Sequence, residues 1–188
     1  MKNNLIFLTL IYLCFSTNIF PQKLSQSNLI KLRIFFYNST DDKNSLDSLS
    51  GFISTLNSND ETDKNPILIA YNGVCNAMYA KYAFFPWNKL KYVNAGMHLL
   101  NKAVEIDSSN LEVHFLRFTV LSNLPSFLGY SSKADFEANK IYYMLKSYDT
   151  SEDVQLIKNI VQFLIESNRL NKIKQEDLSQ YFKLASKQ

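Results

Sequence analysis

Side chains that often carry catalysis or bind metals are sparse in this chain. It has two histidines, His98 and His114, and neither lies in the short H-E-x-x-H or H-x-x-H spacing that brings two ligands to one metal ion. No G-x-S-x-G, P-loop or G-x-G-x-x-G motif occurs. We therefore expect no metal site, no cofactor and no catalytic residue. His98 is expected on a solvated helix face, and His114 as a hydrogen-bonded core histidine.

Arg117 is the strongest candidate for a functional residue, because it lies inside an almost wholly apolar segment, residues 111–121. A guanidinium stays charged, so it must pair with an acid, reach water or face a cavity. One interpretation is a structural salt bridge, with Asp135, Glu137 or Glu105 as the partner. The other is a binding groove, in which the planar fork of Arg117 receives a partner carboxylate bidentately.

Four aromatic residues beside expected turns complete the candidate groove: Trp87, Tyr92, Phe127 and Tyr130. Aromatic side chains at turns usually pin a loop onto the core. Tryptophan and tyrosine are also enriched at binding hot spots, and the loop at residues 122–131 is long for a compact helical protein. Both interpretations stay open.

The elements that would position these residues are helices. Apolar residues recur at helical spacing in eight segments, and no segment alternates with the period of a strand. In the third helix Asn65 is a cap and Pro66 the first residue, and the apolar pattern runs to Phe85. Within it Ala70, Gly73, Ala77 and Ala80 form a small-residue stripe that would allow a neighbouring helix to approach closely.

Side-chain caps mark several of the later helix starts. We expect Asn88 to cap the fourth helix, and three capping boxes to start the next ones: Ser109 with Glu112, Ser132 with Asp135, and Thr150 with Asp153. The last helix is expected to open at Glu176 and Asp177. The core is expected around Val74, Met78, Leu100 and Phe118.

Helix pairs recur with a regular period. The first helix of each pair starts near residues 26, 66, 110 and 151, about 40 to 44 residues apart, which is typical of an α-solenoid. The segment from Leu100 to Asn110, LNKAVEIDSSN, resembles the end of a tetratricopeptide repeat, where a helix closes with an A-x-E-x-D-P-x-N-like run. Ser108 stands at the usual proline, and the G-x-x-Y spacing of a first repeat helix is absent.

A longer pattern resembles a family of exported, uncharacterised bacterial proteins. It runs from Pro86-Trp87 through Arg117-Phe118 to the run Phe127-Leu128-Gly129-Tyr130. This resemblance implies architecture and export and brings no assigned activity. Together the patterns predict an all-α fold of about eight helices, arranged as four antiparallel pairs in a tetratricopeptide-like solenoid, with an irregular helical bundle as the alternative.

The N-terminal segment predicts export. Lys2 precedes a compact apolar run from Leu5 to Phe15, which is too short to span a bilayer. We expect a signal peptide at residues 1–21 and a single helical domain at residues 22–188, located in the periplasm or at the cell surface. The alternative is an uncleaved short anchor, the one membrane contact expected. After cleavage Cys75 is the sole cysteine, expected as a buried thiol.

Composition sets the remaining limits on function. The formal charge of +3 and the scattered lysines exclude a nucleic-acid groove. We expect a non-catalytic scaffold or a module that binds an unknown protein or peptide partner. A small-molecule or lipid-binding helical domain and an enzyme of unknown class are the alternatives.

Overall fold

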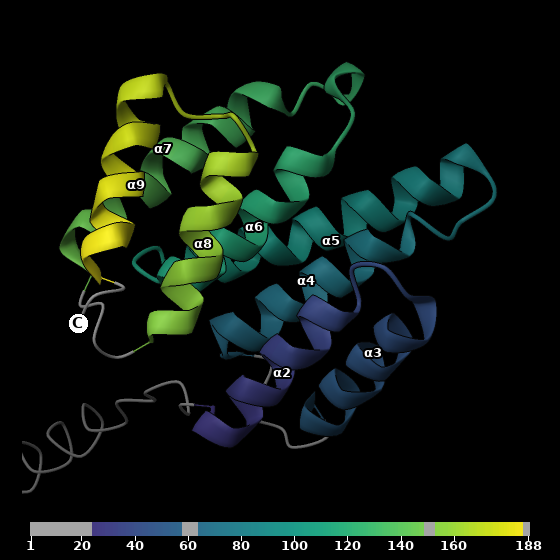
Figure 1. Cartoon of the computed structure of the whole chain (residues 1–188). Helices are drawn as coiled ribbons and strands as arrows, with labels where there is room; N and C mark the ends of the chain where they lie inside the picture. Colours follow the sequence, from purple (N-terminus) through teal and green to yellow (C-terminus); the bar gives the residue numbers. More distant parts are fainter. Residues whose placement is uncertain (1–23, 58–63, 149–152, 186–188) are drawn as a thin grey trace, which may run out of the picture.

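Regular secondary structure in the described residues, which are 24–57, 64–148 and 153–185 of a computed structural model, is entirely helical (Figure 1). This confirms the all-α prediction. Eight α-helices and one 3-10 turn cover these ranges: α2 (Gln26–Asn38), α3 (Lys43–Asn57), α4 (Pro66–Tyr79), α5 (Pro86–Ile106), α6 (Leu111–Asn123), η2 (Ser126–Leu128), α7 (Ser131–Ser147), α8 (Val154–Glu166) and α9 (Lys172–Ala185). None of these helices is both long and apolar enough to cross a membrane. The expected signal peptide lies outside the described residues.

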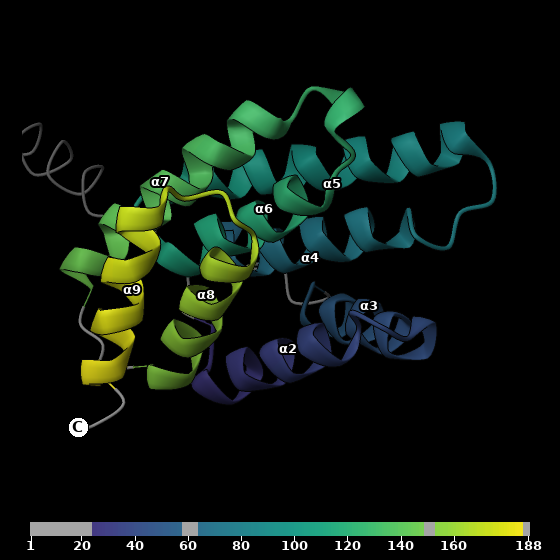
Figure 2. The same cartoon turned by 45° about the horizontal axis from the view of Figure 1, so that its top comes forward.

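Helices that follow one another in the chain pack as pairs: α2 with α3, α4 with α5, α6 with α7, and α8 with α9. The first members of the pairs also contact one another, in the order α2, α4, α6, α8. Figures 1 and 2 show α6 in the middle of the molecule, and both show the outer end of the α4–α5 pair projecting beyond its neighbours.

The core consists of two apolar clusters that meet at α6. The first gathers side chains from α2 to α6 and Ala134 from the start of α7, and it includes Val74 and Leu100. The second gathers side chains from α6 to α9 and includes Phe118. Because α6 contributes to both, it is apolar almost all round, as its sequence predicted for a helix with neighbours on two sides. Val74, Leu100 and Phe118 are buried as expected, whereas Met78 is only partly buried.

The small-residue stripe of α4 does permit a close helix contact. A β-carbon added to Gly73 would lie 2.8 Å from Cγ of Leu100, and one added to Gly96 would lie 2.8 Å from Cβ of Ala77. Only glycine allows two backbones to approach this closely, so these positions fix how α5 lies on α4.

The start of α4 was predicted correctly, but its end was not. The side chain of Asn65 accepts hydrogen bonds from the amides of Ile67 and Leu68, and Pro66 is the first helical residue. The helix ends at Tyr79 rather than Phe85. A residue before proline disfavours the helical region, and Phe85 is extended, with φ −86° and ψ 139°.

Most of the side chains that were predicted to cap later helices do not do so. Helix α5 begins at Pro86 and not at Asn88, and no side chain caps it. Asn110, not Ser109, caps α6 and accepts from the amide of Val113 at 3.1 Å. Neither member of the Ser132–Asp135 pair caps α7.

The last two helices also begin at other residues than expected. Asp153 was expected as the second member of a capping box, but it is itself the N-cap of α8 and accepts from the amide of Leu156 at 3.4 Å. Thr150, the expected cap, lies outside the described residues. Helix α9 begins at Lys172, four residues before Glu176, because the side chain of Asn171 accepts from the amide of Lys174 at 3.0 Å.

Candidate functional site

A buried carboxylate, Glu137, lies at the centre of the candidate site. It projects inward from α7 and is fully buried. One of its oxygens lies 2.5 Å from Nδ1 of His114, and the other accepts a hydrogen bond from Nη2 of Arg117. Both partners are on α6. Burial raises the pKa of Glu137, but the hydrogen bonds and positive charge of His114 and Arg117 outweigh it, so the pKa lies below its ordinary value.

His114 is the hydrogen-bonded core histidine that the sequence predicted. Its ring is fully buried, and Nε2 lies 3.0 Å from the backbone oxygen of Ser108. Both ring nitrogens therefore face oxygen atoms of the protein. His98, in contrast, is exposed on α5, also as predicted.

Arg117 binds its acid differently from Arg33, another partly buried arginine. Arg33 donates two parallel hydrogen bonds to Glu112, from Nε to Oε1 at 2.8 Å and from Nη2 to Oε2 at 2.7 Å. At Arg117 only Nη2 reaches Glu137, because the second oxygen of Glu137 faces His114. The Nε–H of Arg117 is buried and has no hydrogen-bond partner among the described residues. A buried N–H without an acceptor costs about 1–3 kcal/mol. The third nitrogen, Nη1, donates to Oδ1 of Asn101 at 3.4 Å.

A pocket of about 280 Å³ opens where α5, α6 and α7 meet at Arg117. We call it the Arg117 pocket, and its lining residues are Met97, Asn101, Arg117, Leu121, Ser132, Lys133, Phe136 and Glu137. Two of these residues come from α5, two from α6, among them Arg117, and four from α7, among them Lys133. Apolar side chains from all three helices line the pocket, so it combines cationic donors with apolar walls.

A second, more open depression continues the site along α7. It is lined by Phe136, Asn139, Lys140, Tyr143, Met144 and Ser147. Phe136 lines both hollows, so the two are adjacent. Their lining contains three cations, Arg117, Lys133 and Lys140, and one carboxylate, Glu137. The combined surface is therefore complementary to an anionic ligand.

The five predicted groove residues lie in three places. Arg117 lines the pocket, and Tyr130 is next to it, since Nζ of the pocket residue Lys133 lies 5.2 Å from the centroid of its ring. Phe127 is 85% exposed on η2. Trp87 and Tyr92 lie towards the outer end of the α4–α5 pair, and Trp87 is ten residues, or about 15 Å of helix, from Met97.

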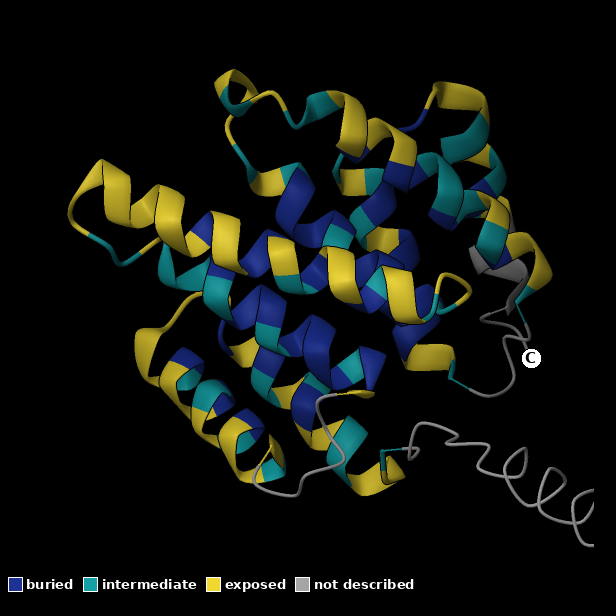
Figure 3. Cartoon of the chain, turned by 180° about the vertical axis from the view of Figure 1, so that it is seen from behind, coloured by how far each residue is buried: buried dark blue, intermediate teal, exposed yellow. Residues whose placement is uncertain are grey.

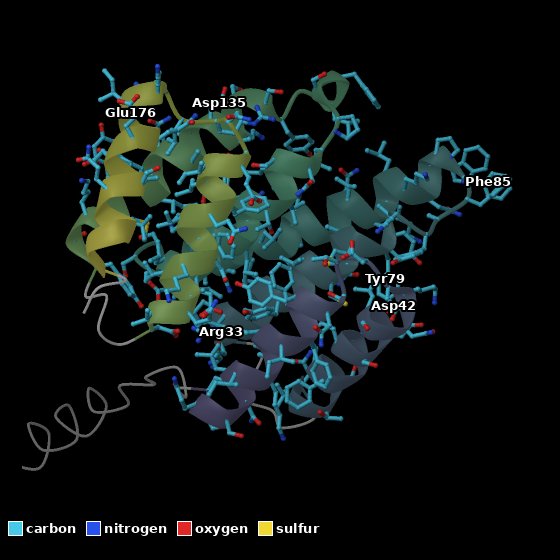
Figure 4. The ribbon with its side chains drawn as sticks, viewed as in Figure 1. Arg33, Asp42, Tyr79, Phe85, Asp135 and Glu176 are labelled. Atoms are coloured by element: carbon cyan, nitrogen blue, oxygen red, sulfur yellow. The ribbon has the colours of Figure 1, made fainter. Side chains whose placement is uncertain are left out.

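Three acids were expected as salt-bridge partners of Arg117, and the structure shows Glu137 as its partner. Asp135 instead accepts a bond from Arg169 at 3.2 Å, and Glu105 is exposed. Figure 4 shows Asp135 at the outer start of α7, beside α9.

Sequence reasoning missed a second buried polar cluster, around Glu112. This residue accepts the two bonds from Arg33 and one from the hydroxyl of Tyr71 at 2.6 Å, and Arg33 also binds Asp153 at 2.5 Å. The cluster joins α2, α4, α6 and the start of α8. It has no pocket of its own among those described, so we assign it to the fold.

Ser132 and Lys133 are the lining residues of the pocket that carry nucleophilic groups, and both are exposed. Both ring nitrogens of His114 are engaged, with Glu137 and Ser108, so this ring is not placed as a base for Ser132. Cys75 is buried in α4, as predicted, and its burial raises the pKa of the thiol to about 11, which keeps it protonated. In the part of the chain that the structure describes, no group of three His, Cys, Asp or Glu side chains is placed to hold a metal ion.

No family model, curated protein or solved structure matches this chain.

Proposed function

We propose that this chain is a non-catalytic binding module, and that the Arg117 pocket receives a carboxylate group of a peptide or protein partner. The observation that carries this proposal is the buried Nε–H of Arg117, which lacks an acceptor although Arg117 lines a pocket. A carboxylate oxygen supplies that acceptor, and Lys133 adds a second cation at the rim. Glu137 bonds to the guanidinium and is itself bonded to His114, so the two residues position Arg117.

The size and shape of the site favour one terminal residue of an extended ligand. A drug-sized small molecule usually occupies 300–1,000 Å³ and is largely enclosed. The Arg117 pocket, of about 280 Å³, is smaller, and it shares the lining residue Phe136 with the open depression along α7. The apolar pocket walls suit an apolar terminal side chain. The upstream residues of a peptide would then lie along α7, where Lys140 favours an acidic sequence.

We further propose that the four helix pairs form a tetratricopeptide-like stack and that the chain is exported. The successive contacts of α2, α4, α6 and α8 support a stacked repeat. Lys2 and the apolar run that follows it support export. Mass spectrometry of the protein from cell fractions tests export: we expect an N-terminus between residues 17 and 23 in an exported fraction. An intact Met1 in a cytoplasmic fraction would refute it.

A peptide titration tests the binding proposal. The probe is acetyl-Asp-Asp-Leu, prepared with a free or an amidated C-terminus and measured by isothermal titration calorimetry. We expect binding only of the free acid. Arg117→Lys keeps the charge but loses Nε and should weaken binding about tenfold, the loss of one charge-assisted hydrogen bond. Arg169→Lys, at a paired arginine outside the pocket, is the matched control. Equal binding of acid and amide would contradict the proposal.

A further inference from the structure

Exposed aromatic side chains gather at the outer end of the α4–α5 pair. We call this surface the hairpin tip and define it as Phe84, Phe85, Trp87 and Leu90. Their exposed fractions are 86%, 44%, 65% and 44%. Figure 3 shows the first turns of α5 at this end as exposed, whereas the end of α4 beside them is of intermediate burial. Figure 4 shows Phe85 at the outer limit, beyond Tyr79 and Asp42.

The aromatic rings of the tip pack on each other rather than on the body of the protein. Phe85 and Trp87 stack with centroids 4.6 Å apart and planes 12° apart, and Phe84 meets Phe85 edge-on at 5.0 Å. The proline at the start of α5 fixes the turn that presents them. The result is a preformed apolar protrusion, which is unusual on a surface that only faces water.

Lysines are the charged residues that follow the tip along α5. Lys89 and Lys91 lie in the first turns of this helix, and both are exposed. The sequence contains no Asp or Glu from residue 65 to residue 104, which includes all of α4 and nearly all of α5. The single acid of α3, Asp47, accepts a hydrogen bond from the hydroxyl of Tyr79 at the end of α4, and it is paired with Lys43 at 2.8 Å.

We propose that the hairpin tip inserts into the interface of an anionic lipid bilayer. Phenylalanine and tryptophan partition to the headgroup region, and lysines beside them bind anionic lipid at the surface. The protrusion is convex, and neither pocket described above is lined by its residues. A stable protein interface needs about 800 Å² on each partner, whereas insertion needs only a few projecting side chains. This inference is independent of the proposed peptide site and adds a membrane contact away from the N-terminal segment.

Trp87 makes the proposal directly measurable, because it is the single tryptophan of the chain. We would mix the full chain with vesicles of phosphatidylcholine, with or without phosphatidylglycerol, and record its emission and its quenching by iodide. Anionic vesicles should shift the emission to the blue and protect Trp87, and high salt should reverse both effects. Neutral vesicles should have a much smaller effect.

Variants test whether the hairpin tip, rather than another part of the chain, binds the vesicles. Phe84→Ser should weaken partitioning about tenfold, and Lys89→Glu with Lys91→Glu should remove the response to anionic lipid. The matched controls are Phe127→Ser, at an 85% exposed aromatic, and Lys31→Glu with Lys172→Glu, which change the net charge equally.

Three outcomes would overturn the proposal. The first is an emission of Trp87 that does not respond to anionic vesicles. The second is a response that the tip variants leave unchanged, which would assign binding to the N-terminal segment. The third is a blue shift that grows with protein concentration in the absence of vesicles, which would show that a second copy of the chain covers the tip.

Discussion

A β-carbon on Gly96 of α5 would lie 2.5 Å from the carbonyl oxygen of Gly73 of α4. Real β-carbons essentially never lie within 3.0 Å of a non-bonded heavy atom. The obstructing atom here belongs to the backbone, so it cannot rotate away. The contact therefore fixes the separation of α4 and α5. Through α5 it positions both the wall of the Arg117 pocket and the hairpin tip.

Substituting alanine at Gly96 should consequently destabilise the protein. We expect a loss of about 2 kcal/mol in the free energy of unfolding, because overpacking costs about 1–3 kcal/mol and exceeds the gain in helix propensity. Gly51 is the control, since a β-carbon there meets nothing within 4 Å and the residue lies within α3. Gly51→Ala should stabilise by about 0.5–1 kcal/mol. Urea unfolding of both variants measures these changes. A Gly96→Ala variant as stable as the unmodified protein would contradict the close contact.

Truncation of Phe118 should be among the most destabilising single changes in α6. The side chain is fully buried in the second core cluster and meets Phe163 edge-on, with ring centroids 5.5 Å apart. Phe118→Ala should lower the free energy of unfolding by about 3–5 kcal/mol. A loss below about 1 kcal/mol, which is typical of surface sites, would show that α6 is peripheral.

The buried Glu137 predicts a specific pH dependence of stability. Its pKa is lowered in the folded protein, so its contribution is fully present above the unfolded pKa of about 4.3 and is lost as pH falls through the lower folded value. Glu137→Gln should cost about 3 kcal/mol at neutral pH, because it leaves the Arg117 guanidinium without its carboxylate. The difference from the unmodified protein should shrink as the pH is lowered below about 4.

The control for this prediction is Glu105→Gln, since Glu105 is exposed on α5. Its effect on the free energy of unfolding should be small and nearly constant over the same pH range. Chemical unfolding at a series of pH values provides the comparison. A cost of Glu137→Gln that does not vary with pH would mean that the carboxylate is not ionised in the folded protein.

Local signals in the sequence predicted the helices well, because caps and apolar periodicity act over a few residues. Asn65 with Pro66 set the start of α4, and the small stripe anticipated the contact with α5. The end of α4 was missed because Ala83, Phe84 and Phe85 continue the apolar pattern, although they form an exposed turn.

Long-range polar contacts explain why the buried polar clusters could not be predicted from the sequence. Phe136 is 68% exposed and its neighbour Glu137 is buried, which is the reverse of their hydropathies. Arg117 and His114 of α6 account for this difference, because both bond to the buried carboxylate. Arg33 and Glu112 are 79 residues apart, and nothing in a single sequence connects them.

The most direct test of the proposed binding site follows the Nε–H signal of Arg117 by ¹⁵N NMR. The chain has three arginines, and those of Arg33 and Arg169 serve as internal references. Titration with N-acetylleucine should shift the Arg117 signal, because its carboxylate supplies the missing acceptor, while N-acetylleucinamide should not. The signal is assigned by its absence in Arg117→Lys. An Arg117 signal that stays unchanged with the acid, or moves equally with the amide, would contradict a carboxylate site at this pocket.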